Sequence, residues 1–224
     1  MYLNPNFKSV YLTETVYGES SRILRVNGNW YFIECEDKYK GWINNFYGFV
    51  SPKKNNAKFI IVNPDSNGKY SFKYPFGAIT QKELEGSISL NKKLGINSVK
   101  DIVNNLVGCP YKWGGKTSLG FDCSGLIQSV LKACGYRIPR DSFQQKEFFN
   151  DCVIDLEDSK CGDLHFFGKS DKVSHVAFSL GGLDFIHSQG NVKIESLYKP
   201  SNNFNSILLD LYLSTCSIRL KFNK

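Results

Sequence analysis

One segment of the chain, residues 109–125, constrains both the fold and the chemistry. It reads CPYKWGGKTSLGFDCSG, a glycine-rich loop that leads into Cys123. After this cysteine, apolar side chains recur at helical spacing as far as Gly135 and Pro139, which predicts a helix of about three turns beginning near Cys123. The unpaired N–H groups and the positive dipole end of a first helical turn favour a thiolate, the form that attacks carbonyl carbons. The pattern therefore predicts a nucleophile at Cys123.

A cysteine on an amphipathic helix has a second interpretation, because free cysteines are commonly small buried side chains. The chain has seven cysteines, an odd number without a repeated spacing, so we expect no disulfide framework. Its three histidines are not spaced with the cysteines as in zinc fingers, so we expect no structural metal site.

Length and charge exclude several classes of protein. A chain of 224 residues can bury one good core plus a small second domain. The net charge is +7, but no Lys/Arg run exceeds two residues and no nucleic-acid-binding motif occurs, so we expect no nucleic-acid partner. No run of 18 apolar residues occurs, so we expect no membrane-spanning helix.

The first residues, MYLNPNFK, lack the basic and apolar segments of a secretory signal. This predicts a cytoplasmic location if the chain is complete, and a cell-envelope or secreted location if a leader was trimmed.

The region 1–95 is predicted to be a small all-β domain. Its expected strands are short and apolar: residues 10–12, 21–26, 30–35 and 41–43. The turn Asn27-Gly28-Asn29 between the second and third predicts a hairpin. This order resembles a bacterial SH3-like barrel, a domain that binds cell-wall components or shapes a neighbouring active site in families that carry it. A further hairpin, from strands at 58–62 and 69–74, allows a second, reduced unit of the same kind.

The remaining residues, 96–224, are predicted to form an α+β domain. A helix at 97–108 opens it and the Cys123 helix follows. Four strands are expected after these helices: residues 162–167, 172–180, 183–188 and 217–222. Helices followed by an antiparallel meander are typical of the α+β class.

Two histidines of this meander, His175 and His187, are predicted to meet. If residues 180–182 form a three-residue loop, the register of the hairpin places His175 directly opposite His187. Directly paired residues share a face, with Cβ atoms about 5 Å apart. We therefore predict a relay in which His175 receives the proton of Cys123 while His187 orients His175.

Six motifs resemble, in order, those of the NlpC-type cell-wall cysteine peptidases, which have a papain-like core. They are residues 110–115 (PYKWGG), 120–125 (GFDCSG), 139–142 (PRDS) with Gln145, 162–164 (GDL) with Phe166 and Phe167, 174–176 (SHV), and 185–187 (FIH). Together with the SH3-like region, they resemble γ-D-glutamyl-L-diamino acid endopeptidases. Such enzymes cleave L-Ala-γ-D-Glu from the diamino acid of murein (peptidoglycan) stem peptides, without a metal or cofactor.

The resemblance implies a role for each matched residue. Cys123 would be the nucleophile, His175 the base and His187 the third, orienting residue. Tyr111 is a candidate to stabilise the oxyanion together with the backbone N–H of Cys123. A packed ring with a bonded hydroxyl is the alternative for Tyr111.

Asp122 and Ser124 flank the nucleophile and, by the same resemblance, would bind the free amine of an N-terminal L-Ala. Asp122 has a second interpretation as the cap of the helix, and both roles are compatible. We expect Arg140 to be structural rather than catalytic. His165 stands where such enzymes usually carry an apolar residue, and we assign it no role.

Two rival functions stay open at this point. The first is an amidase or transacylase on the same fold, and the second is a non-enzymatic cell-wall-binding protein. All three expected catalytic positions are filled, which favours an enzyme with a murein-derived peptide as its substrate.

Overall fold

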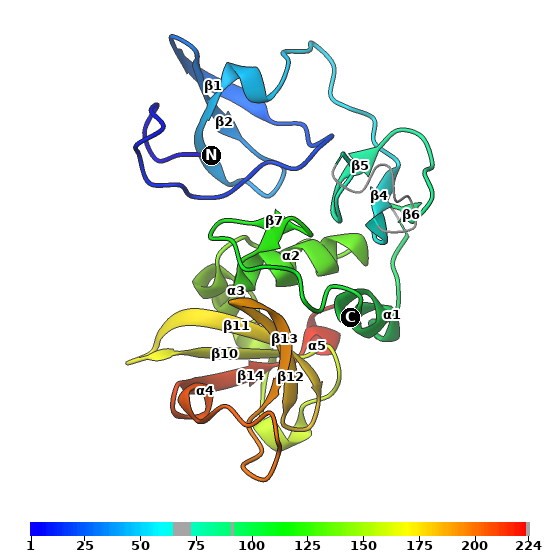
Figure 1. Ribbon diagram of the computed structural model, residues 1–224, viewed down its shortest axis with the longest axis vertical. Coiled ribbons are helices and arrows are strands. Elements are labelled where there is room, and N and C mark those ends of the chain that lie inside the picture. Colours follow the sequence, from blue (N-terminus) through cyan, green and yellow to red (C-terminus); the bar gives the residue numbers. More distant parts are fainter. Residues whose placement is uncertain (65–72, 91, 223–224) are drawn as a thin grey trace.

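The computed structural model describes residues 1–64, 73–90 and 92–222. These residues form an α+β fold, as predicted. Two small sheets lie at one end of the molecule and a six-stranded antiparallel sheet lies at the other, with α2 and α3 between them (Figure 1). Across the described ranges, no helix combines the length and apolar character that crossing a bilayer requires.

The first small sheet has the order β1-β2-β3 and confirms the strands expected at 21–26, 30–35 and 41–43. The strand expected at 10–12 is wrong, because Tyr11 forms an isolated bridge with Tyr2 instead. Its strands are β1 (Arg22–Asn27), β2 (Trp30–Glu34) and β3 (Lys40–Asn44). Asn27 pairs with Trp30, so Gly28 and Asn29 form a two-residue turn. Gly28 has a φ of 55°, a left-handed conformation that this kind of hairpin turn requires and that glycine adopts without strain. A short 3₁₀ helix, Asn45–Tyr47, follows the sheet.

The second small sheet has the order β5-β4-β6. Its strands are β4 (Phe59–Ile61), β5 (Ile79–Thr80) and β6 (Ser87–Ser89). The strand expected at 69–74 falls mostly outside the described residues. The SH3-like assignment and the domain boundary at residue 95 stay predictions.

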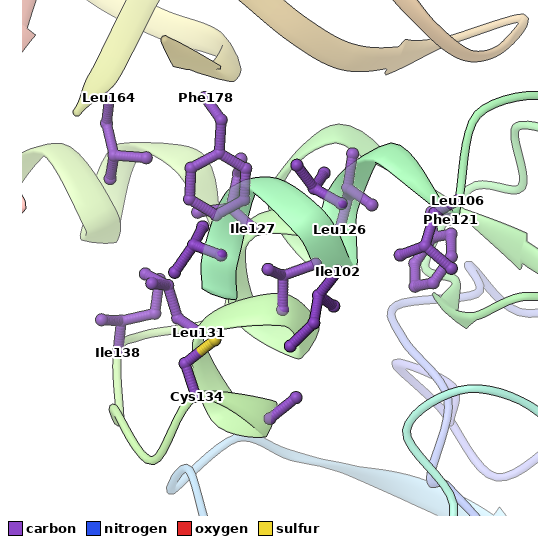
Figure 2. Packing of buried hydrophobic residues seen from close by; sticks show 14 of the residues in the cluster. Ile102, Leu106, Phe121, Leu126, Ile127, Leu131, Cys134, Ile138, Leu164 and Phe178 are labelled. Carbon is purple, nitrogen blue, oxygen red and sulfur yellow. The ribbon is translucent and has the colours of Figure 1, made fainter. Parts of the chain in front are cut away.

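The central element of the fold is α2 (Cys123–Ala133), which confirms the helix predicted after Cys123. It has α1 (Ile96–Asn104) and α3 (Ser142–Phe148) as neighbours, and the hairpin β7 (Lys116–Thr117) and β8 (Gly120–Phe121) precedes it. Leu126, Ile127 and Leu131 are fully buried in one cluster with Leu164 and Phe178 of the large sheet (Figure 2). Each such buried side chain stabilises the fold by roughly 1.5–3 kcal/mol, so the start of α2 is held rigidly.

The large sheet has the order β13-β12-β11-β10-β14-β9. Its strands are β9 (Val153–Ile154), β10 (Leu164–Lys169), β11 (Lys172–Gly181), β12 (Asp184–Gln189), β13 (Asn191–Ser196) and β14 (Tyr212–Cys216). Alternate residues belong to different cores: Leu164 and Phe166 join the α2 cluster, whereas Phe167 joins a smaller cluster with Phe185 and Leu208. This alternation reflects the two-residue period of a strand. Two 3₁₀ helices, Asn150–Cys152 and Leu156–Asp158, flank β9.

The strand predicted at 217–222 is wrong, because these residues form α5 (Ile218–Phe222). Ile218 and Phe222 are four residues apart and therefore lie on one face of a helix. Ile218 is buried, and the ring of Phe222 lies 4.5 Å from the ring of Tyr136. The last strand is instead β14, which follows the short helix α4 (Ser206–Asp210).

Candidate active site

Asp122 determines where α2 begins. Its backbone is extended, and its Oδ1 accepts a hydrogen bond of 2.6 Å from the backbone N–H of Gly125. Such a cap satisfies an N–H group that has no partner inside the helix. Gly125 also has to be small, because a Cβ there would lie 2.0 Å from the carbonyl oxygen of Gly115. The predicted cap at Asp122 is thus confirmed, and Cys123 is the first residue of the helix.

Asp122 also forms a buried ion pair with Arg140, whose side chain is about 1% exposed. Nη1 of Arg140 donates to Oδ1 at 2.9 Å and Nη2 donates to Oδ2 at 2.6 Å. Nη1 also donates to Ser124 Oγ, and Nε donates to Thr13 Oγ1, both at 2.9 Å. Arg140 therefore has the structural position that the sequence analysis expected.

The carboxylate of Asp122 is fully engaged. Besides Arg140, it accepts hydrogen bonds from the N–H of Gly114, the N–H of Gly125 and the hydroxyl of Ser124. Its two oxygens thus receive five hydrogen bonds, whereas a carboxylate offers about four lone-pair sites. A substrate amine can bind Asp122 only by replacing one of these donors, and binding at Asp122 and Ser124 stays a prediction.

Cys123 is buried, with 9% of the residue exposed. Burial and, to a lesser extent, the charge of Asp122 raise the pKa of the Cys123 thiol to about 11, against the backbone N–H groups of Val176 and Ser124, which lower it. The predicted thiolate is therefore wrong for the free protein. Desolvation of a sulfur anion outweighs the stabilisation that the helix N-terminus supplies. A base must remove the thiol proton for Cys123 to attack.

His175 on β11 and His187 on β12 are brought together. Nε2 of His175 lies 2.7 Å from Nδ1 of His187. The predicted direct pairing is wrong, because Ser179 pairs with Phe185 and the register is shifted by two residues from the expected one. The two histidines are therefore diagonal neighbours, which long side chains can still bridge.

Both imidazoles are neutral at pH 7. Burial and, to a lesser extent, the neighbouring His187 lower the pKa of His175 to about 3. Burial likewise lowers the pKa of His187 to about 4, against the opposing charge of Glu195. A neutral imidazole has one N–H donor and one bare nitrogen, so His175 is able to act as a base.

Glu195 on β13 is a site residue that the sequence analysis missed. Its Oε2 lies 2.9 Å from Nε2 of His187. The strand was not predicted, although polar and apolar residues alternate along it after Gly190. That alternation is the one signal that would have indicated a third strand beside the two histidines.

Tyr111 lies in the loop before the nucleophile and is 37% exposed. Its N–H donates to the carbonyl oxygen of Gly190 at 2.9 Å. Burial, then the neighbouring Cys123 and Asp122, raise the pKa of its hydroxyl to about 12. The hydroxyl thus keeps its proton at neutral pH and is available as a donor near Cys123. A role in binding the oxyanion stays a prediction.

His165 is not part of this group. It is fully buried on β10, and its Nδ1 lies 2.9 Å from Thr215 Oγ1. The ring of Phe185 contacts both the ring of His165 and the ring of His187. The structure describes no hydrogen bond between His165 and the catalytic candidates.

Comparison with known families identifies the segment that carries this site. The sequence model of the NlpC/P60 family matches residues 108–206, which include the glycine-rich segment 109–125, α2, and the pair His175 and His187. The chain contains an NlpC/P60 family domain. This finding agrees with the resemblance of the six motifs and with the α+β fold.

Two curated relatives of this chain have the same name. The γ-D-glutamyl-L-lysine dipeptidyl-peptidase of Bacillus subtilis (strain 168) is 26% identical over 220 residues, covering 80% of this chain and 73% of the relative. The enzyme of that name from Bacillus cereus is 39% identical over 110 residues, covering 45% of this chain and 32% of the relative. Protein P54 of Enterococcus faecium is 38% identical over 105 residues, and this chain spans only 19% of it.

A solved structure shares the fold. The NlpC/P60 family protein from Bacillus cereus superposes with a TM-score of 0.75 at 21% identity, covering 92% of this chain and 81% of that one. The shared fold thus extends beyond the family match at residues 108–206 to the N-terminal region.

Proposed function

We propose that this NlpC/P60 chain is a cysteine peptidase that hydrolyses the bond between γ-D-glutamate and the diamino acid of murein stem peptides. The observation that carries the proposal is Cys123 at the buried start of α2, beside the strand that holds the hydrogen-bonded pair His175 and His187. The names of the two Bacillus relatives support the choice of bond.

The reaction proceeds in two acyl-transfer steps. His175 takes the thiol proton while the sulfur of Cys123 bonds to the γ-carbonyl carbon of D-glutamate. The tetrahedral intermediate collapses to a thioester, and the amine of the diamino acid leaves with the proton that His175 returns. Water, deprotonated by His175, then attacks the thioester and releases the dipeptide and the free thiol. In this proposal Tyr111 would donate a hydrogen bond to the oxyanion.

A free N-terminal L-Ala is the second part of the proposal. An incoming ammonium would replace the longest of the bonds to Asp122, the 3.3 Å bond from the Ser124 hydroxyl. The ammonium would then bind the carboxylate while Ser124 keeps its hydrogen bond from Arg140. Because Arg140 already compensates the charge of that carboxylate, a directed hydrogen bond would hold the ammonium more than charge attraction would.

The test is mass spectrometry of the products from L-Ala-γ-D-Glu-diaminopimelate and from the same peptide N-acetylated. Cleavage of the free peptide alone supports both parts of the proposal, and Cys123→Ala should abolish it. Cleavage of both peptides keeps the bond but contradicts the amine requirement. Cleavage of neither peptide overturns the proposed function and moves the search to other acyl substrates.

A further inference from the structure

Glu195 and the two histidines form a hydrogen-bonded chain whose proton positions are not free to vary. An ionised carboxylate only accepts hydrogen bonds, so the Nε2 of His187 that lies 2.9 Å from it must carry a proton. Because His187 is neutral, its Nδ1 is then bare and accepts. The partner atom at 2.7 Å, Nε2 of His175, must therefore be the donor. The atom that is left without a proton is Nδ1 of His175.

The carboxylate is itself held in place. Asn205 Nδ2 donates to Oε2 of Glu195 at 2.6 Å, and Lys193 Nζ lies 2.8 Å from Oε1. The amide of Asn205 cannot flip without loss, because its Oδ1 caps α4 by accepting from the N–H of Leu208 at 2.9 Å. Burial opposes ionisation of Glu195, but hydrogen bonds from Lys193 and Asn205 lower its pKa below the ordinary value. Glu195 is thus ionised at neutral pH.

We propose that Glu195 is a positioning residue that fixes the tautomer of His187 and, through His187, keeps Nδ1 of His175 free to act as the base. Without the carboxylate, His187 could carry its proton on Nδ1 and donate to His175. His175 would then hold its own proton on Nδ1 and could not accept one from a thiol. The charged groups around this pair are Glu195 and Lys193, both from β13.

The experiment measures the proton positions directly. The chain has three histidines, so ¹⁵N-histidine labelling and long-range ¹H–¹⁵N correlation spectra resolve each ring. In the wild type we expect protons on Nε2 of both His175 and His187. A proton on Nδ1 of His187 in the wild type would overturn the inference without any variant. The remaining ring, His165, contacts neither Glu195 nor the pair and is an internal reference.

Variants connect the tautomer to catalysis. In Glu195→Ala we expect both tautomers of His175 and a fall in kcat of about 10–100-fold, the size typical of losing an orienting hydrogen bond, with little change in KM. Glu195→Gln should restore the single tautomer of His175 and the kcat, because an amide oxygen can accept hydrogen bonds from His187 and Asn205. Glu34→Ala is the matched control, since Glu34 pairs with Arg22 and Lys40 and lies on β2.

If kcat fell in Glu195→Ala while the ¹⁵N chemical shifts of His175 and His187 stayed as in the wild type, the role of Glu195 would be merely structural and the inference would be overturned. The kcat readout rests on the proposed function, but the spectra need no substrate. If the wild type cleaves no murein peptide while the tautomer of His175 still depends on Glu195, the proposed substrate fails and the positioning role stands.

Discussion

Removal of Arg140 should destabilise the protein severely. In Arg140→Met, Asp122 would remain a buried carboxylate without its cation, and breaking a buried pair in this way costs about 3–5 kcal/mol. The hydrogen bonds from Gly114, Gly125 and Ser124 persist, so we expect the lower end of that range, about 3 kcal/mol. For a chain of this length, 1 kcal/mol lowers Tm by roughly 2–4 °C, which gives a fall in Tm of about 6–12 °C.

Scanning calorimetry at pH 7 would measure this change, with two further variants as controls. Arg137→Met changes an exposed arginine of the same loop and should cost less than about 0.5 kcal/mol. The double variant Arg140→Met, Asp122→Asn removes the uncompensated charge, so it should melt above the Arg140→Met single variant. A fall in Tm of less than 3 °C for Arg140→Met, or a double variant that melts below it, would refute the reasoning.

Two further predictions concern buried charge. The pKa of Glu19, buried but paired with Lys116 and Lys132, is lowered from 4.5 to about 2. This shift contributes about 3 kcal/mol of stability, which is present above pH 4.5 and is lost as the pH falls toward 2. The Tm of the wild type should therefore fall more between pH 4.5 and pH 2 than the Tm of Glu19→Gln. An equal fall in Tm for the two proteins would contradict this. Alkylation of Cys123 by iodoacetamide should accelerate above pH 9 toward the thiol pKa of about 11, and a rate plateau below pH 7 would instead indicate a thiolate paired with protonated His175.

Local signals in the sequence were sufficient for the start of the nucleophile helix. Asp122 as a cap, the apolar spacing after Cys123 and the break at Gly135 are all contained in about a dozen neighbouring residues, and each is present in the structure. The protonation state of the Cys123 thiol was predicted wrongly because it does not depend on local sequence alone. The helix dipole can be inferred from sequence, whereas the burial that raises the pKa of Cys123 depends on residues distant in the chain.

The histidine pair was predicted for a reason that survives an error in register. A strand register that is wrong by two residues keeps each side chain on its face, so His175 and His187 still meet diagonally. To predict Glu195 as a neighbour of His187, one would also have to know the register between β12 and β13, and no sequence motif indicated that pairing. At the C-terminus, α5 has five residues, too few to distinguish a helical period from the alternation of a strand.

The N-terminal region contacts the glycine-rich segment before Cys123 in ways that no local sequence pattern predicts. The indole N–H of Trp113 donates to the carbonyl oxygen of Tyr11 at 3.0 Å, and the ring of Tyr11 lies against Gly114, where a Cβ would come within 2.7 Å of it. Thr13 donates to the carbonyl oxygen of Gly114 and accepts from Arg140.

These contacts connect the first residues of the chain physically to the sulfur of Cys123. Thr13 holds Arg140, Arg140 holds Asp122, and Asp122 caps the helix that presents Cys123. All the polar groups in this series are buried, so loss of any one leaves its partner without a hydrogen bond at a cost of roughly 1–3 kcal/mol. The geometry of Cys123 is therefore set jointly by the N-terminal region and by the NlpC/P60 domain.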